Sequence, residues 1–109
     1  MRKLKKLELL RKSPHLQNAI NAVIAERVKQ LDLFGDQSLL PLEMWPAILG
    51  EEFGEFCEAV TETCAENGRH PERGGVRNIY KEACQIAAVA VQVMEILLQR
   101  IDAGGPSDV

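Results

Sequence analysis

Three glutamates and one glutamine have the spacing expected of a divalent-cation site. Glu52 and Glu55 are three residues apart, and so are Glu82 and Gln85. Residues i and i+3 are neighbours on one face of an α-helix, so each pair can supply two oxygen ligands to one centre. Oxygen ligands without histidine or cysteine favour Mg²⁺ or Mn²⁺ over zinc. We therefore predict that the two pairs converge on Mg²⁺, with Mn²⁺ as the alternative ion.

Proline and glycine divide the body of the chain into the helices that would position these pairs. A first helix follows Ser13-Pro14 and runs to about residue 33, where Phe34-Gly35-Asp36 breaks the pattern. A second begins between residues 42 and 45 and runs to about 66, and a third covers about 76–103. Segments with the alternating pattern of strands are absent from the sequence, which therefore predicts an all-α helical bundle.

Helical periodicity places the glutamates near the core. Glu52 falls at the border between an apolar face and an acidic stripe, and Glu82 falls within an apolar arc of the third helix. A carboxylate buried without a partner costs several kcal/mol. Glu82 therefore needs either a shared cation or a Lys or Arg from a neighbouring helix, and the sequence leaves both open. A solvated surface would equally produce the stripe, which consists of Glu51, Glu55, Glu58, Glu62 and Glu66.

The charge is unevenly distributed along a chain of single-domain size. The 109 residues are 46% hydrophobic and 27% charged, as in ordinary globular proteins. The net charge of −3 combines six basic residues against one acidic residue in 1–12 with seven basic against fifteen acidic residues in the rest. We expect a basic N-terminal extension (1–12), a helical domain (13–103) and a flexible tail (104–109). The acidic body disfavours nucleic acid as the main partner.

The cysteine and hydropathy patterns favour a cytoplasmic protein. Cys57, Cys64 and Cys84 form no CxxC or Cys/His cluster, so they predict neither a disulfide framework nor a zinc site. The basic N-terminus lacks the apolar stretch of a signal peptide. The sequence also has no uncharged apolar run of the length that crosses a bilayer, so we expect no membrane partner.

Three stretches resemble the MazG-like proteins of the all-α nucleoside triphosphate pyrophosphohydrolase superfamily. They are residues 26–35, 45–55 and 82–90, and the similarity covers roughly residues 20–98. Its most specific element is EExxE, here Glu51-Glu52-Phe53-Gly54-Glu55, followed on the next helix by a second acidic motif. That second motif is usually ExxD in the superfamily, whereas here it is ExxQ, with Gln85 in the last position.

The resemblance implies Mg²⁺-dependent hydrolysis of an NTP or dNTP to the monophosphate and pyrophosphate, in nucleotide-pool house-cleaning. Glu52, Glu55 and Glu82 match the metal-binding carboxylates, and Gln85 would add a neutral oxygen. Glu51 or Glu55 would orient the attacking water as a general base. The family also implies a homodimer or homotetramer, which agrees with a third helix too apolar for one chain to cover. We expect oligomerisation to complete a four-helix core.

Six further residues are candidates for substrate binding. Arg73, Arg77 and Lys81 belong to the only dense basic group of the body and would contact the distal phosphates, although a solvated loop would have the same composition. Trp45 would stack on the base unless it belongs to the core, and Arg27 and Gln30 would line the nucleoside end. Two alternatives remain. One is a non-catalytic helical metal-binding or assembly module, and the other, less favoured, is a phosphoribosyl-ATP hydrolase.

Overall fold

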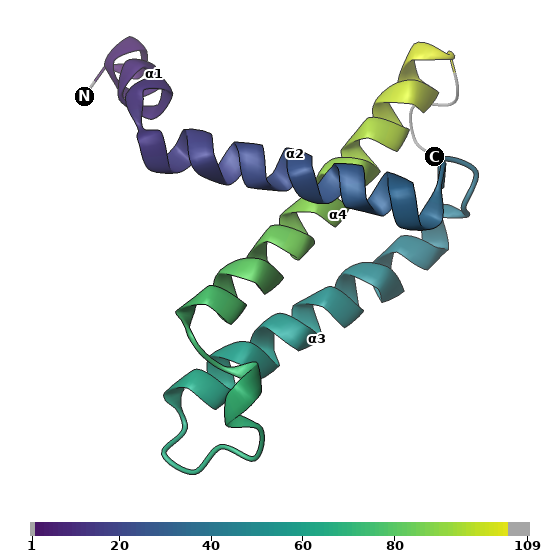
Figure 1. The fold of residues 1–109 in the computed structure, drawn as a ribbon. Coiled ribbons are helices and arrows are strands. Elements are labelled where there is room, and N and C mark those ends of the chain that lie inside the picture. The colour runs from purple at the N-terminus through teal and green to yellow at the C-terminus, as the bar shows by residue number, and fades with distance from the viewer. Residues whose placement is uncertain (1, 105–109) are drawn as a thin grey trace.

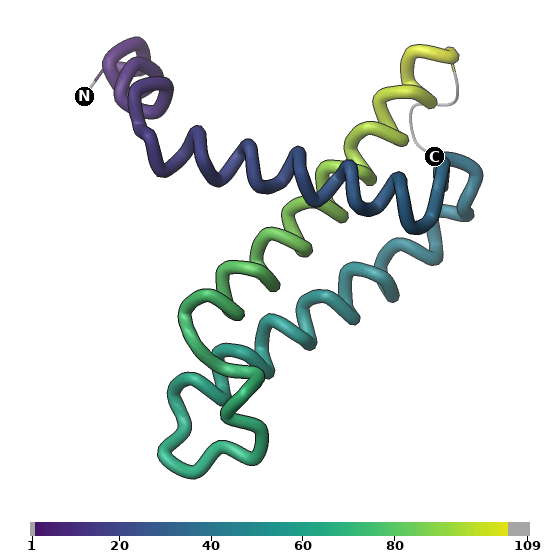
Figure 2. Tube along the Cα trace, viewed as in Figure 1, coloured from purple at the N-terminus to yellow at the C-terminus, as the bar shows by residue number. Residues whose placement is uncertain are grey.

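The computed structural model describes residues 2–104, which form four α-helices and no strand (Figures 1 and 2). The helices are α1 (Lys3–Lys12), α2 (Pro14–Phe34), α3 (Trp45–Cys64) and α4 (Val76–Asp102). Two short 3₁₀ turns, η1 (Leu42–Met44) and η2 (Pro71–Arg73), precede α3 and α4. The all-α prediction is confirmed. Of the predicted tail, 104–109, all but Gly104 lies outside the described residues.

Local sequence explains where the helices begin and end. The Ser13 hydroxyl accepts a hydrogen bond from the Leu16 N–H at 3.2 Å, and Pro14 occupies the first turn of α2, where its missing N–H costs nothing. Gly35 ends α2 with a φ of 65°, and Gly75 precedes α4 with a φ of 101°. Both values lie in the region that favours glycine. The predicted ends of the three body helices therefore agree with the structure to within about two residues.

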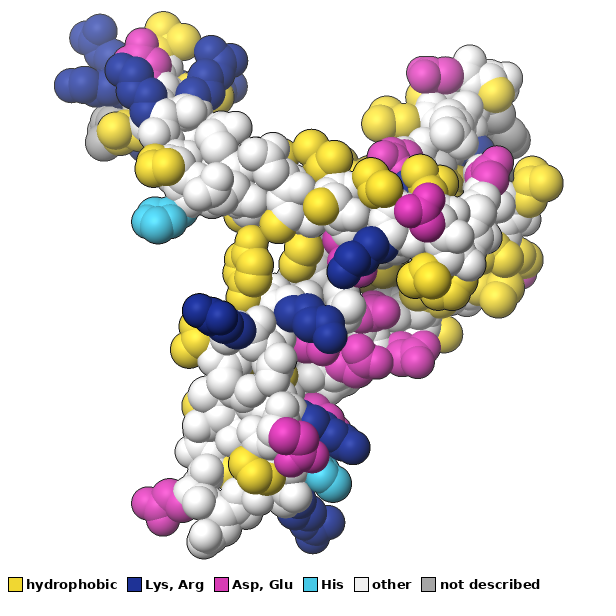
Figure 3. All heavy atoms as spheres, in the orientation of Figure 1, with side chains coloured by type: hydrophobic (Ala, Val, Ile, Leu, Met, Phe, Trp, Pro, Cys, Tyr) yellow, Lys and Arg dark blue, Asp and Glu magenta, His cyan; other side chains and the backbone are white. Residues whose placement is uncertain are grey.

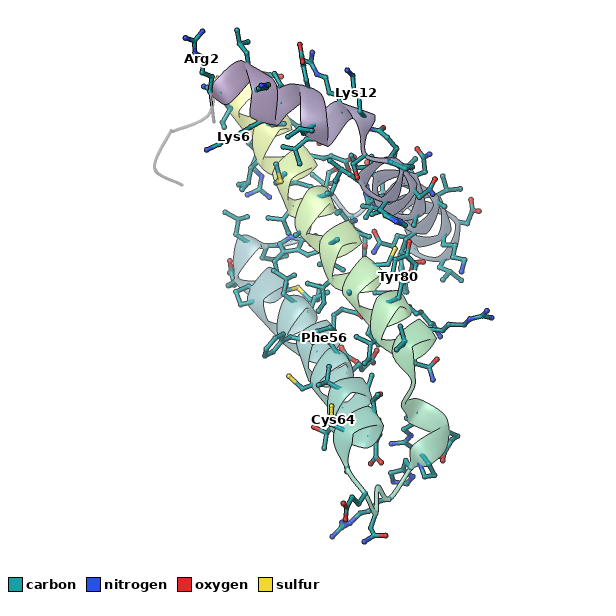
Figure 4. All side chains as sticks on the ribbon, turned by 90° about the vertical axis from the view of Figure 1, so that its left-hand side faces the viewer. Arg2, Lys6, Lys12, Phe56, Cys64 and Tyr80 are labelled. Carbon is teal, nitrogen blue, oxygen red and sulfur yellow. The ribbon has the colours of Figure 1, made fainter. Side chains whose placement is uncertain are left out.

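The helices α3 and α4 form an antiparallel pair, and α2 crosses α4 (Figures 1 and 4). The buried core consists of Trp45, Val89 and Ile96, against which five partly buried residues pack: Leu40, Leu42, Ile48, Leu49 and Val93. This packing fixes the start of α3 against the middle of α4. The basic helix α1 lies apart from this core and buries none of its residues (Figure 3).

The described chain is more open than a folded monomer of its size. Its radius of gyration is 17.1 Å, whereas about 13 Å is typical of 109 residues. Its accessible surface is 8532 Å², against about 6,000 Å² for a compact 12.1 kDa protein. Large hydrophobic side chains on α2, α3 and α4 remain exposed, among them Ile24, Val28, Phe53, Met94 and Leu98.

By length and composition alone, α4 could cross a membrane. Its most apolar 18 residues have a mean hydropathy of 1.4, and 22% of them are buried. This finding is weak support for a membrane helix, because the core helices of soluble proteins meet the same criterion.

Candidate metal centre and adjoining cavities

Glu52 and Glu55 of α3 meet Glu82 of α4. One carboxylate oxygen from each of the three residues lies within 4.8 Å of the other two. The i,i+3 spacing puts the first two on one side of α3, and the antiparallel pairing brings α4 alongside them. Within residues 2–104, Glu82 forms no salt bridge with a Lys or Arg. The predicted convergence of the two helices is confirmed, and a basic partner for Glu82 is not found there.

The cluster carries negative charge that its surroundings neutralise only in part, through the charge of Lys81, which lowers the pKa of Glu82. Burial raises the pKa of Glu52 above its ordinary value, and the charges of Glu55 and Glu82 raise it further. Burial is also the largest cause that raises the pKa of Glu82. A hydrogen bond with Glu55 and the negative charge of Glu55 raise it further. Glu26 of α2 is close enough to raise both pKa values. A divalent cation would relieve this repulsion.

Gln85 belongs to the same cluster. When its amide nitrogen faces the carboxylates, it donates to Glu82 Oε2 at 2.8 Å and to Glu52 Oε2 at 3.2 Å. Turning the amide by 180° would present the carbonyl oxygen at the same place. Gln85 therefore lies beside Glu52 and Glu82, and its role as a metal ligand stays a prediction.

Two of the three predicted phosphate-binding residues lie beside the cluster. A cavity of about 350 Å³ is lined by both Glu55 and Glu82 and by Arg73 and Lys81. Arg73 Nη1 donates to Glu58 Oε1 at 3.1 Å, which holds the guanidinium at the cavity wall. Arg77 is exposed and does not line this cavity. Figure 3 shows acidic side chains gathered beneath the crossing of α2, with basic side chains around them.

A second cavity, of about 400 Å³, also adjoins the cluster, because Glu52 lines it. We call it the α2 cavity. Its complete lining is Glu26, Gln30, Leu33, Phe34, Gln37, Trp45, Ile48, Glu51, Glu52, Gln85, Val89 and Gln92. Trp45 is only 3% exposed and packs in the core, so its ring is part of the wall.

Of the two residues predicted to line the nucleoside end, only Gln30 lines the α2 cavity. Arg27 instead forms an ion pair with Glu95 at 2.5 Å and donates to Gln30 Oε1 at 2.9 Å. Arg27 therefore orients the Gln30 amide through this hydrogen bond.

Sequence reasoning missed three polar residues of this site: Glu26, Gln37 and Gln92. Gln92 is seven residues after Gln85, on the same line of α4, and that spacing was a usable signal. Glu26 is four residues before Gln30 on α2. Gln37 lies in the connection after α2, where no periodicity indicates which way a side chain points.

Comparisons with known proteins give no assignment: no family model matches the chain, and the searches of curated proteins and of solved structures found no match.

Proposed function

We propose that the protein is a Mg²⁺-dependent nucleoside triphosphate pyrophosphohydrolase that acts in nucleotide-pool house-cleaning in the cytoplasm. The observation that carries this proposal is the convergence of Glu52, Glu55 and Glu82 to within 4.8 Å. The cluster lies between a cavity that contains Arg73 and Lys81 and a larger, partly apolar cavity. A triphosphate needs such an arrangement, because its charged and its apolar ends require different surroundings.

The residues present fit Mg²⁺. Three carboxylates and one amide oxygen are hard ligands of the kind that this ion takes, and the raised pKa values of Glu52 and Glu82 indicate a need for positive charge. Glu52, Glu55, Glu82 and the Gln85 carbonyl would hold the ion. When bound, Mg²⁺ supplies the charge that stabilises a pyrophosphate leaving group.

The side chains of the chain itself would perform the remaining steps. Glu51 is exposed at the edge of the α2 cavity and is not one of the three clustered carboxylates, so it is free to take a proton from an attacking water. Glu55 is engaged with Glu82 and suits a ligand role better. Arg73 and Lys81 would bind the distal phosphates, and Trp45 and Gln30 would contact the nucleoside.

We further propose that two copies of the chain associate as a homodimer, which could pair again as a tetramer. The surface in excess of a compact monomer is about 2,500 Å² per chain, so two chains have about 5,000 Å² to cover, the size of an obligate homodimer interface. The outer face of α4 has alternating spacings of four and three residues, as in a helix that packs along another helix. Its members are Tyr80, Cys84, Ala87, Val91, Met94, Leu98 and Ile101.

Pyrophosphate release from a panel of NTPs and dNTPs with Mg²⁺ tests the enzymatic proposal. We expect turnover by the native chain and its loss in Glu52→Gln and Glu82→Gln. Glu66→Gln is the matched control, because it removes the same charge from an exposed position just beyond α3. Metal binding without turnover of any nucleotide would instead support the non-catalytic metal-binding or assembly module.

A further inference from the structure

The α2 cavity has the size and lining of a small-molecule site. Its volume of about 400 Å³ lies within the usual range for such sites, roughly 300–1,000 Å³. Apolar side chains line much of it, and three glutamines, Gln30, Gln37 and Gln92, add polar groups. Gln30 is 8% exposed and Gln92 is 5% exposed. Amides buried to this degree require hydrogen-bond partners, so their orientation determines what the cavity accepts.

The orientation of Gln30 is fixed by Arg27. The guanidinium donates to Gln30 Oε1 at 2.9 Å, and Arg27 is itself held by two hydrogen bonds to Glu95. Because a guanidinium has only donors, the contact must involve the amide oxygen. The Gln30 Nε2 group has no other partner among the described residues and therefore offers donors to a ligand.

Gln92 and Gln37 orient one another. Gln92 Nε2 donates to Gln37 Oε1 at 3.1 Å. In this orientation Gln92 retains its oxygen as an acceptor and Gln37 retains its nitrogen as a donor, and turning both amides would only exchange the two groups. The three amides together offer donor groups at Gln30 and Gln37 and an acceptor at Gln92. Trp45 lines the same cavity, and its indole N–H is buried without a hydrogen-bond partner within residues 2–104.

We propose that these three glutamines select a nucleotide whose base presents an imide edge, the uracil and thymine class. An imide edge has a carbonyl acceptor, an N–H donor and a second carbonyl acceptor, which complements two donors and one acceptor. The pairing edge of cytosine or adenine has a ring-nitrogen acceptor where an imide has its N–H, and guanine has a single carbonyl there. Each would leave a buried amide group unpaired, and sites of this kind discriminate strongly against such ligands. The inference rests on the proposed function in that the cavity adjoins the metal cluster.

Binding of deoxynucleosides without phosphate or metal tests the selection directly. Trp45 is the only tryptophan of the chain, so its fluorescence reports on the cavity, and ligand-observed NMR provides a second measurement. We expect deoxyuridine and thymidine to bind at least tenfold more tightly than deoxycytidine, deoxyadenosine or deoxyguanosine. Where nucleosides bind too weakly to measure, the same ratio is read from kcat/KM across the corresponding triphosphates. Equal values, or a preference for another base, would overturn the proposal.

A variant pair separates hydrogen-bond selection from cavity shape. Gln92→Leu removes the acceptor and should reduce the preference to less than about threefold, whereas Gln99→Leu, on α4 but outside the α2 cavity, should leave it unchanged. An unchanged preference in Gln92→Leu would contradict the assigned role of this amide. Hydrolysis without base preference would overturn the selection but not the enzyme. Base-selective binding without hydrolysis would overturn the proposed enzyme but not the base selection.

Discussion

Replacing Glu82 by glutamine should stabilise the metal-free protein while abolishing its metal binding. Glu82 is half-buried, its carboxylate lies within 4.8 Å of those of Glu52 and Glu55, and no cation is bound to a metal-free chain. Glu82→Gln removes the charge, keeps the shape and has an amide N–H that can donate a hydrogen bond to Glu55. The repulsion is therefore removed without creating a hole in the packing.

The expected gain follows from the distances. Two unit charges 4.8 Å apart repel by about 0.9 kcal/mol in water and by about 3.5 kcal/mol at an effective dielectric constant of 20. Because Glu55 is exposed, the low end of this range applies to its pair with Glu82. With the low value for both pairs, the two interactions of Glu82 together give about 1.7 kcal/mol, which corresponds to a rise in Tm of roughly 5–10 °C for a domain of this size.

Thermal unfolding followed by circular dichroism measures this difference, with both proteins at one concentration in EDTA at pH 7.5. Adding Mg²⁺ to 100 times its Kd should stabilise the native protein by about 2.7 kcal/mol and leave the stability of Glu82→Gln unchanged. The native protein should then have the higher Tm of the two. Glu66→Gln should resemble the native protein in both conditions. A Glu82→Gln protein that melts below the native one in EDTA, or that still responds to Mg²⁺, would refute the reasoning.

The same repulsion predicts a pH dependence. Because the folded-state pKa of Glu82 lies above its ordinary value of 4.5, the folded protein binds more protons than the unfolded chain in that interval. The contribution of Glu82 to the stability of the metal-free protein is therefore fully present below that ordinary value and is lost as pH rises through the folded-state pKa. The Tm advantage of Glu82→Gln should accordingly be small at pH 4 and develop between pH 4.5 and neutrality. An advantage that does not vary with pH would assign the effect to packing.

Three further predictions concern the phosphate side, the subunit interface and the α3–α4 connection. Arg73→Glu should raise the apparent KM severalfold and Arg77→Glu by less than twofold, because only Arg73 lines the cavity beside the cluster. Equal effects of the two variants in steady-state assays would count against phosphate binding in that cavity. The double variant Met94→Glu with Leu98→Glu should convert dimers to monomers in analytical ultracentrifugation, whereas Leu9→Glu in the exposed α1 should not. A dimer that persists in the double variant would exclude the α4 face as its interface. Gly74→Ala should destabilise the fold by about 1–3 kcal/mol in urea titration, because its Cβ would lie 3.0 Å from the Glu62 and Thr63 backbone, and a neutral result would show that the connection can shift.

The sequence was sufficient for the helices and for the cluster of carboxylates. Both follow from local rules: Ser13 and Gly35 mark the ends of α2, and i,i+3 spacing places Glu52 with Glu55. The convergence of Glu82 on that pair required one further step, the antiparallel packing of two consecutive helices. The α2 cavity was harder to foresee. Its polar wall combines α2, the connection after it and α4, and the crossing of α2 over α4 is a tertiary property that periodicity does not determine.

The opposite faces of α4 help to explain why so apolar a helix carries four regularly placed polar residues. Glu82 and Gln85 belong to the carboxylate cluster, and Gln92 and Glu95 contact Gln37 and Arg27. In a membrane, such a line would need continuous polar partners across the hydrocarbon, whereas here α2, α3 and the intervening connection supply them. The apolar outer face then requires a cover that α2 and α3 do not provide. We infer that a second copy covers it, and that the hydropathy of α4 reflects a bundle core shared between two chains.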